Sequence, residues 1–197
     1  MIARALVRPG GWSLWQRHLA ALGALSLALL ILFREDAADM AAIWWTSSTF
    51  THCLLPVPII GWLVAQRAAQ LAPLTPVYWW PALAWIGGAS VLWLLGEAAT
   101  LALFRQLALV LMLQGAVAAT LGPRLVRALL FPLAYALLLV PFGEELVPLL
   151  QTLTAKISLA LLHLAGRTAE MEGVFITTRA GLFEVAEACS GVNFLIA

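Results

Sequence analysis

The residue with the clearest potential for covalent chemistry is Cys189, because a cysteine thiolate is a strong nucleophile. An apolar stretch begins shortly after it, at Val192, and indicates the start of a helix. The free N–H groups and positive dipole end of such a helix would stabilise a thiolate. Glu184 and Glu187 lie close in sequence and would oppose ionisation, so a cation from elsewhere in the fold is needed. Position alone also fits an inert, buried cysteine.

A second cysteine belongs to the adjacent pair His52-Cys53, in which the histidine could act as a base toward the thiol. Neighbours in sequence rarely point at each other on a helix or a strand, which argues against catalysis by this pair. We expect His52 to be a polar residue at the edge of an apolar segment, where it anchors the chain or lines a cleft. We expect Cys53 to be a packing residue.

Four further polar residues lie in apolar surroundings. Arg105, with Glu97 at the preceding turn, either extends its side chain to the membrane surface or lines an outward-facing cavity. Lys156 and His163 are seven residues apart and share a helix face, which is typical of a solvated face. Asn193 follows Cys189 by four residues and could orient a group near the thiol, although helix packing explains it equally well.

The composition places these residues in a membrane protein. Of the 197 residues, 63% are hydrophobic and 11% are charged, and the mean hydropathy is +0.96. A soluble domain carries about a quarter charged residues, so this surface is suited to lipid. The chain shows no basic cluster that would bind nucleic acid, no metal-ligand spacing and only two cysteines. We therefore expect no metal, no cofactor and no nucleic-acid partner.

Apolar runs predict an all-α integral membrane protein, a polytopic helical bundle in one domain over residues 1–197. A spanning helix needs about 20 apolar residues. Five predicted spans meet this length approximately: 14–33, 50–66, 77–96, 101–121 and 125–142. Residues 146–166 form either an interfacial helix or a sixth span, and we favour the interface because Lys156 would otherwise lie near the bilayer centre. Residues 174–186 predict a short β-hairpin before Cys189.

The distribution of Lys and Arg near the span ends predicts the orientation. Arginines gather on one side, in the N-terminus and in the second and fourth loops: Arg4, Arg8, Arg17, Arg67, Arg124 and Arg127. Up to the end of the fifth span, the opposite side carries only two arginines, Arg34 and Arg105. All ten acidic residues of the chain also fall on that side. We therefore expect a cytoplasmic N-terminus, with the hairpin and Cys189 on the outer side of the membrane; by the resemblance given below, that side is the periplasm.

Several motifs resemble those of the exosortases, in order from about Trp44 to Ala197. The segment from Phe183 to Leu195, with Ala188-Cys189-Ser190-Gly191 near its centre, resembles the active-site motif of the family. The other matching segments are Thr49-Phe50-Thr51-His52 with Pro58, Trp62-Leu63-Val64 and Arg67, then Phe131–Tyr135, Val140–Gln151, Thr154-Ala155 and Glu172-Gly173. The pattern is most similar to the exosortase A type.

This resemblance implies a multi-pass enzyme of the inner membrane of Gram-negative bacteria. Exosortases are understood as cysteine peptidases or transpeptidases that process the C-terminal PEP-CTERM signal of exported proteins, and they are associated with exopolysaccharide production. By resemblance, Cys189 is the nucleophile. The family's arginine and histidine come later, so we expect the reading frame to continue past Ala197 and residues 1–197 alone to be inactive. The alternative is a non-catalytic membrane scaffold or a polysaccharide-export component.

Overall fold

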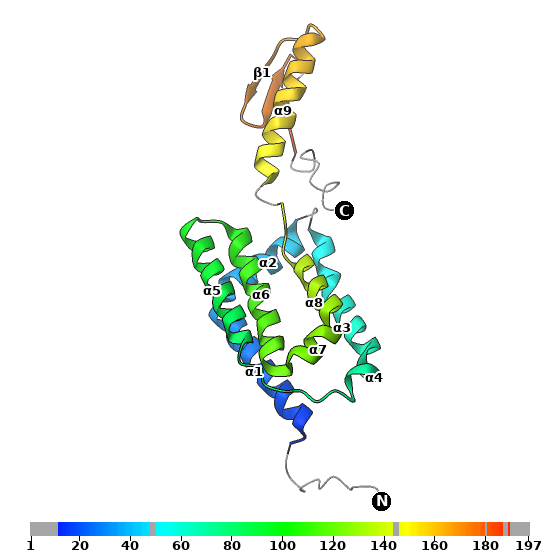
Figure 1. Cartoon of the computed structure of the whole chain (residues 1–197). Helices are drawn as coiled ribbons and strands as arrows, with labels where there is room; N and C mark the ends of the chain where they lie inside the picture. The colour runs from blue at the N-terminus through cyan, green and yellow to red at the C-terminus, as the bar shows by residue number, and fades with distance from the viewer. Residues whose placement is uncertain (1–11, 48–49, 144–145, 180, 187–188, 190–197) are drawn as a thin grey trace, which may run out of the picture. The chain divides into compact units, whose positions relative to one another are not determined.

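The computed structural model describes residues 12–47, 50–143, 146–179, 181–186 and 189. The chain, expected to be one domain, divides into two compact units. The first contains residues 1–41 and 54–140, and the second contains residues 42–53 and 141–197. In the described residues the first unit is helical and the second combines one long helix with a three-stranded sheet (Figure 1). The predicted fold class, a helical membrane protein with a small β element near Cys189, is confirmed.

The first unit is built around helix α6, Ala102–Leu121. Helix α5, Ala82–Ala98, and helix α1, Leu14–Leu32, lie alongside it (Figure 1). Small residues allow this close approach: Ala89 of α5 packs against Ala108 and Ala116 of α6, and Leu29 of α1 completes the cluster. Small residues are the usual means of helix association in lipid, where burial of apolar surface gives little driving force.

Two of the predicted spans are longer than the helices found in their place. Residues 77–81 precede α5 as irregular chain, because Pro76 and Pro81 interrupt regular hydrogen bonding. The backbone N–H groups of Val77 and Trp79 bond instead to the end of α6. Residues 50–66 contain a short 3-10 helix, Thr51–Leu54, and then α3, Pro56–Gln66.

The fifth predicted span, 125–142, is not a continuous helix. It consists of α7 (Pro123–Ala128), α8 (Leu130–Tyr135) and η2 (Ala136–Leu139). Pro132 has no N–H to donate to the carbonyl of Ala128, four residues earlier. The guanidinium of Arg67, which follows α3, donates to that carbonyl instead. A helix break is tolerated where another group satisfies the freed backbone atom in this way.

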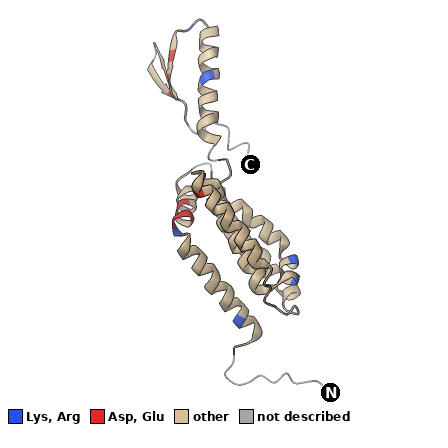
Figure 2. Ribbon diagram, turned by 60° about the vertical axis from the view of Figure 1, so that its left-hand side comes forward, with Lys and Arg blue, Asp and Glu red and all other residues tan. Residues whose placement is uncertain are grey.

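Charges occupy opposite ends of the first unit. Figure 2 shows acidic residues gathered where α1 passes into α2, Arg34–Thr46, and basic residues mainly at the other end of the helices.

Among the described residues, three helices are long and apolar enough to cross a membrane, namely α1, α6 and α9 (Val147–Leu164).

The second unit packs α9 against an antiparallel sheet of order β1-β2-β3. Strands β2 (Phe175–Thr178) and β3 (Gly181–Glu184) form the expected hairpin, with Thr178 paired to Gly181. The sequence analysis missed β1, Ala169–Glu172. Its residues are good helix formers, and its alternating pattern is too short to identify a strand, so pairing with β2 decides its conformation.

Candidate active site

Cys189 is exposed and forms no disulfide. Its backbone N–H donates to the carbonyl of Ala186 at 2.9 Å, which turns the chain tightly after the sheet ends. An accessible thiol is available to an external carbonyl, whereas a buried one would not be. Cys189 is therefore not a buried cysteine, and its reactivity stays a prediction.

Helix α9 holds the segment that carries Cys189. The Thr154 hydroxyl donates to the carbonyl of Cys189 at 3.2 Å. One turn earlier, the Gln151 side-chain amide donates to the carbonyl of Val185. Val185 is itself buried against Ala155, so the chain is fixed at both ends of residues 185–189. Residues three apart lie on one side of a helix, which explains how both side chains reach the same segment.

The other polar groups expected around Cys189 are only partly described. Glu184 lies on the exposed last position of β3. Glu187, Asn193 and the helix expected to begin near Cys189 lie outside the described residues. The role of that helix in stabilising a thiolate therefore stays a prediction.

His52 and Cys53 face each other, contrary to the sequence-based expectation: the sulfur lies 3.7 Å from Nε2 of His52. The tight turn of the 3-10 helix brings these neighbours together, which a regular α-helix would not. Cys53 is only 1% exposed and packs with Phe50 against Val147 and Leu150 at the start of α9. The expected packing role of Cys53 is confirmed, and its thiol has no access for a substrate.

Arg105 forms an ion-pair cluster, an arrangement that the sequence analysis did not consider. Its Nε lies 3.2 Å from Oδ1 of Asp36, and its Nη1 lies 2.7 Å from Oε2 of Glu97. The other Asp36 oxygen accepts a hydrogen bond from the Trp93 indole at 2.7 Å. The cluster joins α2, α5 and α6 and lines a hollow of about 460 Å³, so Arg105 is paired within the protein and also lines a cavity.

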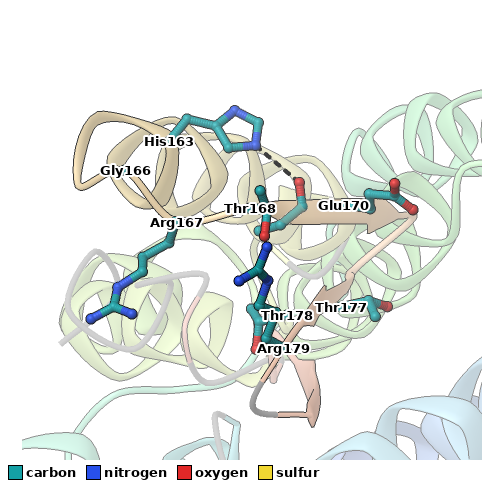
Figure 3. Close-up of a pocket in the computed structure, with 9 residues that line it drawn as sticks. His163, Gly166, Arg167, Thr168, Glu170, Thr177, Thr178 and Arg179 are labelled. Atoms are coloured by element: carbon teal, nitrogen blue, oxygen red, sulfur yellow. Dashed lines mark hydrogen bonds between the residues drawn. The ribbon is translucent and has the colours of Figure 1, made fainter.

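A second hollow, of about 620 Å³, lies where α9 meets β1 and β2 (Figure 3). Its lining includes His163, Arg167 and Arg179. The strand register explains why the two arginines lie near each other in the fold. Ala169 pairs with Thr178, so Arg167, which precedes β1, and Arg179, which follows β2, lie at the same end of the sheet. His163 donates from Nε2 to the carbonyl of Ala169 at 2.9 Å, because a carbonyl can only accept.

This hollow is chemically suited to an anionic group. The guanidinium groups of Arg167 and Arg179 and the hydroxyl of Thr168 can bind a carboxylate or a phosphate, whereas the Thr178 hydroxyl donates its proton to the carbonyl of Gly181. Glu170 also lines the hollow, but its side chain points away from Arg167 (Figure 3). Cys189 is absent from the described lining of the hollow. His163 and Arg179 are therefore not placed as catalytic partners of the thiol.

The sequence analysis missed Gln151 and Thr154 as holders of the cysteine segment and Arg167 as a lining residue. Gln151 and Thr154 lie three residues apart on a predicted helix that precedes the hairpin and Cys189, and this spacing was the available signal. Lys156 and His163 are exposed on one flank of α9, as expected. Five spans were predicted from apolar length alone, whereas these polar contacts depend on the tertiary fold.

Comparison with known proteins identifies the family. No curated protein and no solved structure matches the chain. The family described as transmembrane exosortase (Exosortase_EpsH) matches residues 44–197, which include the cysteine segment, α9 and the sheet. Since this match covers well over half of the chain, the protein belongs to the transmembrane exosortase family.

Proposed function

We propose that this exosortase family member is a membrane cysteine peptidase or transpeptidase that processes the C-terminal PEP-CTERM signal of exported proteins. The observation that carries the proposal is the exposed Cys189, held on α9 by Thr154 and Gln151 within the matched region. We place the protein in the inner membrane with its N-terminus in the cytoplasm and Cys189 in the periplasm, and we link it to exopolysaccharide production.

The proposed reaction is acyl transfer in two steps. The Cys189 thiolate attacks a backbone carbonyl near the substrate's signal, a C–S bond forms, and the C–N bond breaks. The leaving amine takes a proton, and a thioester remains on the enzyme. An incoming amine or water then attacks the thioester, which releases the acyl group and restores the thiol. We expect a histidine to move the protons and an arginine to stabilise the oxyanion, without assigning either role to a described residue.

The test is a pair of cysteine variants expressed from the native gene, with an immunoblot for the uncleaved PEP-CTERM substrate. We expect Cys189→Ala to abolish processing while the protein remains in the membrane. Cys53→Ala is the matched control, because it removes the same group from a buried packing site and should leave processing close to normal. Normal processing by the Cys189 variant would end the proposal.

A thiol-labelling experiment separates an enzyme from a non-catalytic scaffold. An enzyme needs an ionised nucleophile, so Cys189 should react with iodoacetamide at neutral pH faster than an ordinary exposed cysteine. A rate no greater than that of a cysteine introduced at the exposed Glu172 would favour the scaffold.

A further inference from the structure

Helix α9 carries a continuous apolar stripe that nothing in the described residues covers. Leu149, Leu153, Ile157 and Leu161 recur every fourth residue and are each more than half exposed, and Leu164 extends the stripe. Residues spaced by four lie on one face of a helix. The stripe contains no charged residue over the whole length of the helix.

The opposite face of α9 is occupied by the sheet. Ala155, Leu159 and Leu162 pack with Ala169 and Ile176 of the strands. Leu159, on the sheet side, lies two residues from Ile157 and two from Leu161, which belong to the stripe. Two residues correspond to a rotation of about 200° around a helix, so the sheet and the stripe are on opposite sides. The helix is therefore apolar on two faces, of which the protein covers one.

Two observations argue against a spanning orientation for this helix. Lys156 is exposed at its middle, has no ion-pair partner among the described residues, and would lie at the bilayer centre. The sheet packs along the same middle portion, and no other described strand pairs with the outer sides of β1 and β3. Open sheet edges do not occur in the hydrocarbon region, because nothing there satisfies their backbone groups. The outer face of the sheet also carries Glu170 and Glu172.

We propose that α9 lies flat on the bilayer surface, with its Leu149–Leu164 stripe in the lipid and its sheet in water. The start of α9 contacts the residues that lead, in sequence, into a predicted span. Val147 and Leu150, at the start of α9, pack on Phe50 and Cys53, and Pro56 begins helix α3 directly afterwards. A helix with one apolar face and polar flanks binds at this depth, about 5–10 Å into the boundary between headgroups and acyl chains.

This placement sets the height of the cysteine segment. Thr154 and Gln151 lie between the lipid-facing stripe and the sheet-facing residues of α9, and both bond to the segment of Cys189. Cys189 is then held close to the membrane surface. On the proposed function, this is where the chain of a membrane-anchored substrate leaves the bilayer, although the placement of α9 does not depend on that function.

The test measures depth along α9 in the full chain. Single cysteines replace Leu149, Ile157 and Leu164 in a background of Cys53→Ala and Cys189→Ala, and each carries a nitroxide label. The protein is placed in nanodiscs of phosphatidylethanolamine and phosphatidylglycerol. The depth of each label is measured from its collision rates with oxygen and with a nickel chelate. Labels at Leu14, Ala24 and Leu32 of α1 serve as the spanning control, because all three positions are exposed and α1 has spanning length.

We expect the three stripe labels to report one shallow depth, while the α1 labels are deepest at Ala24. A stripe profile that is deepest at Ile157 would show that α9 spans. Stripe labels that are shielded from both reagents would show a protein cover, and labels that are open to water would show no lipid contact. Each of these results overturns the proposal.

A second measurement is independent of label depth. Cysteines at Phe142 and Glu172, before and after α9, should react with a membrane-impermeant maleimide from the same side of intact cells, since both positions are exposed. Reaction from opposite sides would also refute the proposal. Loss of processing alone in any of these variants bears on the proposed function and not on the position of α9.

Discussion

Removal of the Thr154 hydroxyl should slow the reaction of Cys189 by a small and calculable factor. Thr154→Val keeps the shape of the side chain and deletes the donor to the Cys189 carbonyl. A neutral hydrogen bond contributes about 0.5–1.5 kcal/mol net, which corresponds to a factor of about 2–12 in rate if the held geometry is required. This bond is accessible to water, which can replace the lost donor, so we expect the lower half of that range, about 2- to 5-fold.

Gln151→Met is the companion change at the better-protected contact. The Gln151 amide bonds to the Val185 carbonyl in a partly buried position, where water replaces it less easily. We therefore expect the upper half of the range, about 5- to 12-fold. The two bonds hold one segment, so the double variant should depart from the product of the single effects.

Thr152→Val is a closely matched control on the same helix. The Thr152 hydroxyl bonds to the carbonyl of Pro148 within α9 and makes no contact with the cysteine segment. Its loss alters helix stability in the same way as Thr154→Val but leaves Cys189 in place. Substrate processing by the native gene product should fall in kcat, with KM nearly unchanged, for Thr154→Val only.

Rescue by Thr154→Ser distinguishes positioning from a general loss of stability. Serine restores the hydroxyl without the methyl group, so processing should recover to within about 2-fold of the parent. Equal rates for the Thr154→Val and Thr152→Val variants, or a serine variant as slow as the valine variant, would refute the positioning role of Thr154.

Three further outcomes follow from the first unit and the charge distribution. Asp36→Asn should lower the free energy of unfolding by about 1–3 kcal/mol, because Asp36 is almost fully buried. Glu97→Gln changes a half-exposed carboxylate and should lower it by about 0–1 kcal/mol. Equal shifts of the two melting temperatures in nanodiscs would contradict this difference. Arg67→Met should destabilise by about 1–3 kcal/mol, measured in the same way, because it leaves a helix-break carbonyl without its donor. Topology reporters fused after Arg127 and after Gly173 should report opposite sides of the membrane, and a common side would contradict the proposed orientation.

The parts of the fold that the sequence could predict are those that depend on local pattern. Long apolar runs indicate helices α1 and α6, because lipid requires a continuous apolar surface. Phe175–Thr178, followed by a glycine after a short turn, indicates the β2-β3 hairpin. Cys189 stands out because the family's motif surrounds it in sequence.

The parts that the sequence could not predict depend on partners that are distant in the chain. Arg105 finds Asp36 only because α2 and α6 come together, and both interpretations of Arg105 from sequence considered it alone. The fifth predicted span breaks at Leu129, three residues before Pro132, and Arg67 reaches the Ala128 carbonyl that Pro132 cannot bond. Strand β1 forms because β2 offers a paired edge to residues that would otherwise favour a helix.

Helix α9 shows why apolar length alone is a poor guide to topology near this site. Its 18 residues satisfy the length and hydropathy of a span, because apolar residues on two faces add to one average. One set, Ala155 and Leu159, is apolar in order to pack on the sheet. The other set, which includes Leu153 and Ile157, is bare and requires a separate explanation. An average over the helix cannot separate the two sets, whereas the sheet and Lys156 can. Within the described part of the chain the outer strands have free edges and Lys156 has no ion-pair partner, and both are costly in hydrocarbon. On the proposed placement, the helix that resembles a sixth span by composition is a platform, with lipid on one face, the sheet on the other, and the segment of Cys189 bonded between them.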